Sequence, residues 1–207
     1  MKSQTKTWFH GTHALFEAWQ IPPPPKPGQG MLVAHTALFL TSDEQFAAGA
    51  GSGLCAARLV ESARVLDATH PSQESESLRK QVLKNPVASL GANIVDSARW
   101  NAGWKTGETL RFSYDNARAA KVIETTAIAT ARLNRLPIEA GIAIAKHNFA
   151  RGLIELICVE AKKLGFDALL GNEVDQLPDG TRVPRPWLAV FTTDAITPVE
   201  WIRKPQA

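Results

Sequence analysis

Cysteine is scarce in this chain of 207 residues, which contains only Cys55 and Cys158. The two residues form neither a redox motif nor a metal-binding motif, and the five histidines do not pair with them at the spacing of zinc ligands. We therefore expect two free thiols in a reducing compartment, and no metal site. An apolar fraction of 44% is sufficient, at this length, to build a core without disulfide or metal cross-links.

Long apolar runs and a strong excess of one charge are also missing. No apolar stretch reaches the roughly 18 residues that a membrane-spanning helix needs, so we expect no membrane partner. No hydrophobic segment follows the basic residues 1–6, so we expect no secretory signal, and a protein that is cytoplasmic or is delivered into a target cell by another route. The formal net charge is +3 and the charges are scattered, so nucleic acid is permitted as a partner but not indicated.

Common motifs of nucleotide-binding and hydrolytic enzymes are absent as well. The sequence contains no P-loop and no Gly-x-Gly-x-x-Gly segment, which excludes the usual phosphate-binding loops. It also contains no Gly-x-Ser-x-Gly elbow, so a Ser–His–Asp hydrolase has no positional support. Any nucleotide site must therefore be built in another way.

Strand signals gather at the two ends of the chain. Short apolar runs bounded by turn residues predict strands at 6–10, 37–41, 55–67 with a break near 61–62, 166–170, 187–191 and, after a turn, within 194–202. The proline-rich run 22–28 lies between the first two strands, and we predict it to be a stiff surface loop because proline lacks the amide donor.

Helical signals dominate the middle of the chain. They predict one long helix over 117–134 and another over 138–164 with a break near 149–152. Together with the strands, they predict an α+β fold in which residues 1–207 form a single domain and residues 71–164 are a helical insertion.

The segment Phe9-His10-Gly11-Thr12 is the first that could carry chemistry. A strand that ends in His-Gly presents an imidazole beside a backbone that no side chain obstructs. A flat ligand could approach this backbone closely, and His10 could bond a ribose hydroxyl or a phosphate. Taken alone, the four residues are equally explained by a turn glycine that happens to follow a histidine.

The second such segment runs from Leu38 to Ala50. A buried strand ends at the hydroxyl pair Thr41-Ser42, and a short helix rich in small residues follows. We predict Ser42 as the N-cap of this helix, with Gln45 completing a capping box. An ordinary turn between a strand and a helix would use the same residues.

In chain order, these two segments and three later ones resemble the ADP-ribosyltransferase superfamily, nearest to its poly(ADP-ribose)-polymerase and diphtheria-toxin-like branch. The residues that carry the resemblance are Phe9–Thr12, Leu38–Ala50, Arg64–Asp67, Gly165–Leu170 and Trp187–Asp194. The resemblance covers residues 7–67 and 164–203, and the helical middle lies outside it. It implies a split β-sheet core of the ADP-ribosyltransferase type, with NAD as a substrate.

The resemblance also implies which residues contact NAD. His10 would bond a ribose hydroxyl, the backbone of Gly11 would bond the nicotinamide amide, and Thr12 would shape the turn. Phe39 would lie under the nicotinamide ring.

Further contacts are expected from the residues around the second segment. Thr41 or Ser42 would supply a hydroxyl near the ligand. Phe46 would replace a stacking aromatic that some members carry in the first helix, unless it belongs to the core. His35, just before the strand, is a further residue that could line the cleft.

The catalytic carboxylate is where the sequence departs from the family pattern. Breaking the bond to nicotinamide produces a positively charged sugar, which a nearby carboxylate stabilises. The family places a glutamate at the start of the late strand, where this chain has Arg185 and Pro186. Glu173 is the nearest substitute, with Asp175 and Asp179 as alternatives, unless Glu173 is a solvated loop acid.

These features predict an enzyme that transfers ADP-ribose from NAD to a macromolecular acceptor, taken to be a protein. It would be a bacterial toxin or effector, or a phage protein that modifies its host, with a cognate immunity or antitoxin protein as a second partner. An NAD glycohydrolase and a catalytically inactive binding module of the same fold remain alternatives. The helical middle would provide target specificity, and its Trp100 and Trp104 either pack in the core or form an aromatic docking surface.

Overall fold

The computed structural model describes residues 6–24, 32–111 and 117–205, and its fold is α+β, as the sequence predicts. The strands form a three-stranded sheet in the order β1-β3-β7 and a four-stranded sheet in the order β2-β6-β5-β4. Their bounds are β1 (Thr7–Thr12), β2 (Leu38–Leu40), β3 (Gly53–Arg58), β4 (Val65–Asp67), β5 (Ala168–Gln176), β6 (Arg182–Val190) and β7 (Glu200–Arg203).

The two sheets meet at a bridge between Phe9 and Thr41. The Phe9 amide donates to the Thr41 carbonyl at 2.7 Å, and the Thr41 amide donates to the Phe9 carbonyl at 3.0 Å. Within the sheets, β4 and β5 are parallel and the other paired strands are antiparallel. Because Phe9 and Thr41 belong to the two segments with candidate chemistry, the seam between the sheets passes through both.

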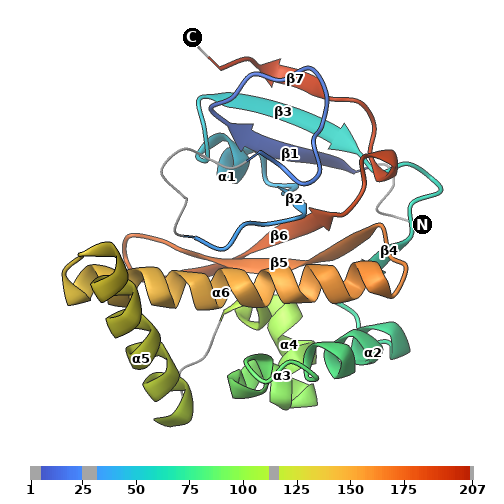
Figure 1. Ribbon diagram of the computed structural model, residues 1–207. Helices are drawn as coiled ribbons and strands as arrows, with labels where there is room; N and C mark the ends of the chain where they lie inside the picture. The colour runs from blue at the N-terminus through green and yellow to red at the C-terminus, as the bar shows by residue number, and fades with distance from the viewer. Residues whose placement is uncertain (1–5, 25–31, 112–116, 206–207) are drawn as a thin grey trace.

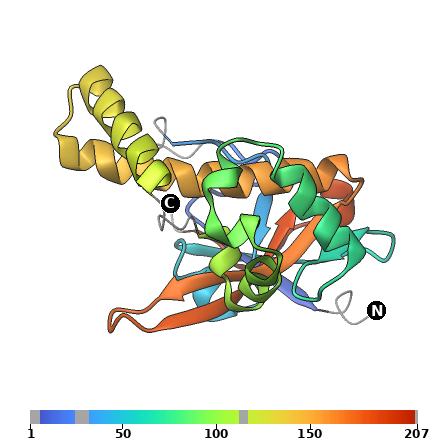
Figure 2. The ribbon, with the colours of Figure 1, turned by 90° about the horizontal axis from the view of Figure 1, so that it is seen from below.

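The helices follow the predicted division of the chain. Their bounds are α1 (Glu44–Ala48), α2 (Gln73–Val82), α3 (Ala92–Val95), α4 (Ser97–Thr106), α5 (Ala117–Asn134) and α6 (Ile138–Lys163), with 3-10 turns η1 (Ala88–Leu90), η2 (Glu108–Leu110) and η3 (Thr193–Ala195). In Figure 1, α6 crosses the four-stranded sheet, and α2, α3 and α4 lie beyond it on the side away from the three-stranded sheet. Figure 2 shows the α5–α6 and β5–β6 hairpins extending past the rest of the molecule on the same side. No helix within the described ranges is long and apolar enough to cross a membrane.

The predicted break near residues 149–152 is wrong, because α6 is one continuous helix. A glycine inside a helix costs about 1 kcal/mol relative to alanine. The flanking residues Leu153 and Ile157 are buried in the core, and Phe149 packs against it, so the packing of this helical face outweighs that cost.

The strands β5 and β6 are longer than predicted. They pair in continuous register from Ala168↔Val190 to Gln176↔Arg182, whereas the sequence predicts strands that stop at residue 170 and begin at residue 187. Polar residues and two prolines favour a loop between residues 170 and 187. The two strands nevertheless pair with each other over this range, because each provides backbone hydrogen-bond partners for the other. The residues proposed as loop acids therefore belong to a hairpin.

The start of α1 also differs from the prediction. Asp43, not Ser42, is the N-cap: its Oδ1 accepts a hydrogen bond from the Phe46 amide at 2.9 Å. A carboxylate at this position also interacts favourably with the positive end of the helix dipole.

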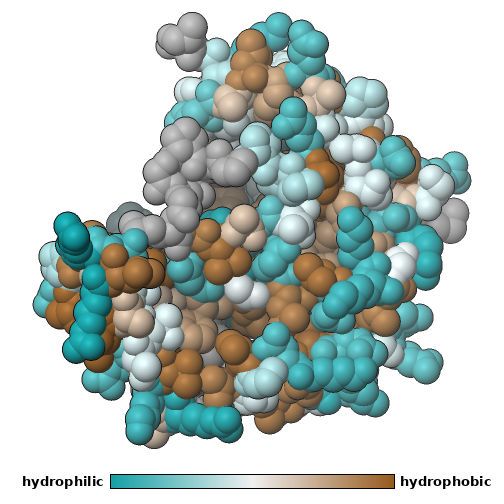
Figure 3. All heavy atoms as spheres, in the orientation of Figure 1, coloured by the Kyte–Doolittle hydropathy of each residue, from teal (hydrophilic) through white to brown (hydrophobic). Residues whose placement is uncertain are grey.

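The core has two parts, one on each side of the four-stranded sheet. Trp100 and Trp104 are fully buried in the part that contains the helices, so the alternative of an aromatic docking surface is wrong. Large apolar side chains are instead exposed at the tip of the α5–α6 hairpin, namely Leu133, Ile138 and Ile142. Figure 3 shows apolar surface gathered over the helical half of this face.

Both cysteines are free, as predicted from their number and spacing, and both are buried. Burial raises the pKa of the Cys55 thiol to about 12 and that of Cys158 well above its ordinary value. Both thiols therefore stay protonated at neutral pH, and neither is a reactive nucleophile.

Gly171 on β5 gives a test of how tightly the helical layer packs on the sheet. A Cβ atom at this position would lie 2.4 Å from the Trp104 ring, which is fully buried and has no room to move. We expect Gly171→Ala to lower the free energy of unfolding by about 1–3 kcal/mol, measured by urea denaturation.

Gly152→Ala is the matched control for this substitution. A Cβ atom at position 152 would meet nothing within 4 Å, and alanine is the better helix former. This variant should be as stable as the wild type or slightly more stable. Equal stability of the two variants would show that β5 and α4 are not in close contact.

Candidate functional site

A large open cavity of about 1700 Å³ lies along the seam between the two sheets, bounded by α1 and α6. Six of the residues predicted to contact NAD line this cavity, namely His10, Gly11, Thr12, Phe39, Thr41 and Phe46. The predicted catalytic residue Glu173 lines the same cavity, whereas Ser42 does not. Residues from both ends of the chain therefore meet at one site.

His10 is held across the seam by a backbone carbonyl. Its Nδ1 donates a hydrogen bond to the Phe39 carbonyl at 2.9 Å, and the edge of its ring faces Trp19 at a centroid distance of 6.2 Å. Because a carbonyl can only accept, Nδ1 carries the hydrogen, and Nε2 is an acceptor when the ring is neutral. The half-buried imidazole thus has a fixed orientation in which it could accept a hydrogen bond from a ligand hydroxyl.

Gly11 is required by the packing of β1 against α1. A Cβ atom at this position would lie 1.8 Å from the carbonyl oxygen of Ala47, so no other residue fits without moving the helix. The sequence explanation, in which glycine clears the way for a ligand, is therefore not the main reason for this glycine. The role of its backbone as a partner for nicotinamide stays a prediction. Thr12 follows, and its Oγ1 accepts a hydrogen bond from the Ala14 amide at 3.0 Å, which closes the turn after β1.

Phe39 belongs to an aromatic wall of the cavity. Its ring stacks on Trp187, with a centroid distance of 5.3 Å and an interplanar angle of 27°. His35 packs edge-on against the other side of Phe39 at 4.8 Å and lines the cavity too. The wall offers flat apolar surface of the kind on which an aromatic ligand ring can pack.

The segment after β2 forms the turn into α1 and part of the cavity surface. The Thr41 hydroxyl is buried and accepts from the Asp43 amide at 3.1 Å, so it helps to form the turn into α1. Phe46 is half-buried at the cavity surface and belongs to neither part of the core, so its alternative role in the core is wrong. The guanidinium of Arg185 lies over its ring at 5.6 Å.

Glu173 lies within β5 and is half-buried, so it is not a solvated loop acid. Burial raises the pKa of its carboxyl group above the ordinary value. The positive charge of Arg111 opposes this shift in pKa, and the negative charge of Asp175 adds to it. A carboxylate in this setting is poorly hydrated, which strengthens its interaction with any positive charge that develops nearby.

The sequence pattern expects the catalytic glutamate near Arg185 or Pro186, and the direct cross-strand partners of these two residues are Glu173 and Asn172. Residues opposite one another in an antiparallel pair have Cα atoms about 5 Å apart. Arg185 itself is bound by two carboxylates, Asp43 at 2.7 Å and Asp175 at 3.2 Å. The chain therefore carries a carboxylate one strand away from the expected place.

The alternative acids are less suited to catalysis. Asp175 lines the cavity, but its charge is compensated by Arg185. Asp179 is exposed in the hairpin turn, where its Oδ1 accepts from the Thr181 amide at 2.9 Å, and it does not line the cavity. The Phe46 amide and Arg185 lower the pKa of Asp43, whose carboxylate is already used as the helix cap. Glu173 is thus the acid best placed for a ligand.

One wall of the cavity was not assigned from the sequence. It is formed by residues on one face of α6, namely Ala143, Lys146, His147, Ala150, Arg151 and Ile154. Their helical spacing is visible in the sequence as a stripe, but the stripe does not reveal that it faces His10. Arg111, after η2, also lines the cavity. The described residues contain no group of three or more side chains that could hold a metal ion.

The raised pKa of Glu173 predicts how its ionisation affects stability. A carboxyl group whose pKa is raised by folding contributes stability that is present below its unfolded pKa and is lost as the pH rises through the folded pKa. Because Glu173→Gln cannot ionise, we expect this variant to gain stability relative to the wild type as the pH is raised from about 4 to 7. Urea denaturation of both proteins across this range measures the difference.

The exposed loop residue Glu17 provides the control for this experiment, since Glu17→Gln also removes one negative charge. A constant difference between Glu173→Gln and the wild type over the whole pH range would contradict the burial of this carboxyl group.

Comparisons with known proteins identify no family for this chain. No protein-family model matches it, and no curated protein matches its sequence. Among solved structures, the chain is similar to one described as the crystal structure of an anti-CRISPR protein, with 16% identity and a TM-score of 0.40. The alignment covers 98% of this chain and 100% of that one. At this TM-score the likeness supports no conclusion about fold or function, so the site must be interpreted from its own chemistry.

Proposed function

We propose that this protein is an NAD-dependent ADP-ribosyltransferase, which breaks the bond between nicotinamide and ribose and transfers ADP-ribose to a macromolecular acceptor, taken to be a protein. The observation that carries the proposal is that His10 and Glu173, far apart in the sequence, line one cavity. The stacked Phe39 and Trp187 add an aromatic wall suited to a nicotinamide ring. The sheets that meet at the Phe9–Thr41 bridge support a split-sheet core of the ADP-ribosyltransferase type.

The chemistry needs little more than positioning and a well-placed negative charge. When the bond to nicotinamide breaks, its electron pair leaves with the nicotinamide nitrogen, and positive charge develops on the ribose. The ionised carboxylate of Glu173 stabilises this charge, and His10 orients the ribose by accepting a hydrogen bond from a hydroxyl. The nucleophile of the acceptor then bonds to the same ribose carbon and loses its proton to Glu173 or to solvent.

The cross-strand position of Glu173 favours an enzyme over an inactive binding module. The argument for an inactive binding module is that this chain has Arg185 and Pro186 where the family pattern has a glutamate. A half-buried carboxylate directly across from Arg185, facing the same cavity as His10, supplies the missing charge. A site that only binds a protein has no need of a poorly hydrated acid at that point.

This activity suits a bacterial toxin or effector, or a phage protein that modifies its host. Such a protein acts on a cytoplasmic target, and its producer needs a cognate immunity or antitoxin protein. The cytoplasmic target and the immunity or antitoxin protein are both part of this proposal, and the experiment below tests them with it.

The proposal is tested by incubating the protein with labelled NAD, with and without a bacterial lysate. We expect nicotinamide release and transfer of label to a lysate protein. Glu173→Gln should lower the rate by roughly 100- to 1,000-fold, as the loss of one transition-state contact does elsewhere. His10→Ala should weaken NAD binding, measured by calorimetry. Glu139→Gln, at the exposed start of α6, is the control and should leave the rate unchanged.

Other outcomes of the same experiment identify the alternatives. Nicotinamide release at full rate without the lysate, and no labelled protein, would identify an NAD glycohydrolase. If NAD is neither bound nor consumed, and the His10→Ala variant affects its target as the wild type does, the enzymatic function is contradicted. The catalytically inactive binding module is then the correct alternative.

A further inference from the structure

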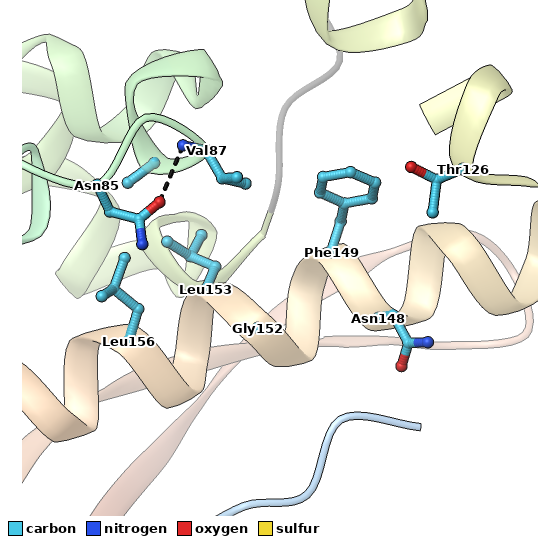
Figure 4. A pocket seen from close by; sticks show the side chains of 9 residues that line it. Asn85, Val87, Thr126, Asn148, Phe149, Gly152, Leu153 and Leu156 are labelled. Carbon is cyan, nitrogen blue, oxygen red and sulfur yellow. Dashed lines mark hydrogen bonds between the residues drawn. The ribbon is translucent and has the colours of Figure 1, made fainter. Parts of the chain in front are cut away.

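The helix α6 separates two cavities and presents a different face to each. Figure 4 shows Phe149, Leu153 and Leu156 on the face that lines a small apolar cavity of about 310 Å³. Asn148 points away from these residues, and its Oδ1 accepts a hydrogen bond from the Val33 amide at 2.8 Å. The segment that leads into β2, which lines the large cavity, is thereby fixed to α6.

Three basic side chains lie on this second face. Lys146, His147 and Arg151 all line the large cavity, and Arg151 is half-buried. The Nε of Arg151 donates to the Val33 carbonyl at 2.7 Å, which fixes the orientation of the guanidinium group. Guanidinium and ammonium groups, together with an imidazole N–H, are the donors with which proteins bind phosphate.

Acidic groups on other elements also line the cavity. Glu173 and Asp175 lie on β5, and Asp43 caps α1. Asp43 and Asp175 both pair with Arg185, so Glu173 is the acid best placed to act on a ligand there. The cavity thus has acidic groups on β5 and α1, suited to a developing positive charge, and basic groups on α6, suited to an anion.

We propose that the face of α6 formed by Lys146, His147 and Arg151 is an anion subsite that holds the diphosphate of a dinucleotide. The proposal rests on the proposed function, because it places the reacting end of the same molecule at His10 and Glu173. A cavity of about 1700 Å³ exceeds the roughly 300–1,000 Å³ of ordinary small-molecule sites, so it has room for a dinucleotide. The subsite lies in the helical middle, outside the segments that resemble the ADP-ribosyltransferase family.

The two ends of this site are fixed to one short segment of chain. Arg151 bonds the carbonyl of Val33, and His10 bonds the carbonyl of Phe39. Six residues of extended chain span at most about 20 Å. The two carbonyls therefore belong to one short segment, which lines the cavity between the basic face of α6 and the seam between the sheets.

The subsite is tested with ADP-ribose, which keeps the diphosphate, and with nicotinamide, which lacks it. Calorimetry at low ionic strength should show that Lys146→Gln with His147→Gln weakens ADP-ribose binding by about tenfold or more and leaves nicotinamide binding unchanged. Both residues are exposed, so we expect the variant to fold, and its Tm checks this. The matched control, Lys105→Gln with Lys121→Gln, removes two exposed lysines outside the cavity and should bind ADP-ribose as the wild type does.

The proposed subsite is contradicted if the wild type and the Lys146/His147 variant bind ADP-ribose with equal affinity, or if the wild type does not bind ADP-ribose at all. It is also contradicted if the wild type binds a single-stranded oligonucleotide in place of ADP-ribose. Turnover is not needed for this measurement, so the two proposals fail separately. ADP-ribose binding through α6 without nicotinamide release would contradict the enzyme and support the subsite. Nicotinamide release with no effect of the variant on ADP-ribose binding would contradict the subsite alone.

Discussion

The two hydrogen bonds between Phe9 and Thr41 are the contact on which the cavity depends. They join β1, at the edge of one sheet, to the end of β2, at the edge of the other. Each sheet thereby protects an edge that would otherwise expose unpaired backbone groups. Among the described residues the pairing is limited to this bridge, so the strands diverge beyond it and leave the space that His10, Phe39 and Glu173 surround.

The two long helices and the positions of most strands along the chain could be predicted from the sequence because their signals are local. The bounds of α5 follow from alanine-rich helical periodicity, and β2 follows from a short apolar run between turns. His10 and Phe39 were assigned to one site because a resemblance linked their two segments. The N-cap was misplaced by one residue, since Ser42 and Asp43 both have side chains that can cap a helix.

The contacts between helices and strands could not be predicted from the sequence. A stripe on α6 indicates a face that packs against something, but it does not identify the facing strand. The position of the Glu173 carboxylate beside Arg185 could not be predicted for the same reason. A sequence pattern is read along one strand, whereas a sheet is a two-dimensional arrangement in which the nearest neighbour of Arg185 is Glu173 on β5. Such cross-strand neighbours are revealed only by the register of the strands.

The continuity of α6 also gives it a mechanical role. A helix of 26 residues is about 39 Å long and resists bending. One end carries the hairpin tip, with Leu133 and Ile138 exposed, and the middle forms the wall of the large cavity. A break at residues 149–152 would have acted as a hinge and absorbed any displacement of the tip. Without one, the exposed hairpin tip and the cavity wall belong to one continuous helix, so the positions of Lys146 and Arg151 are set by the packing along its whole length.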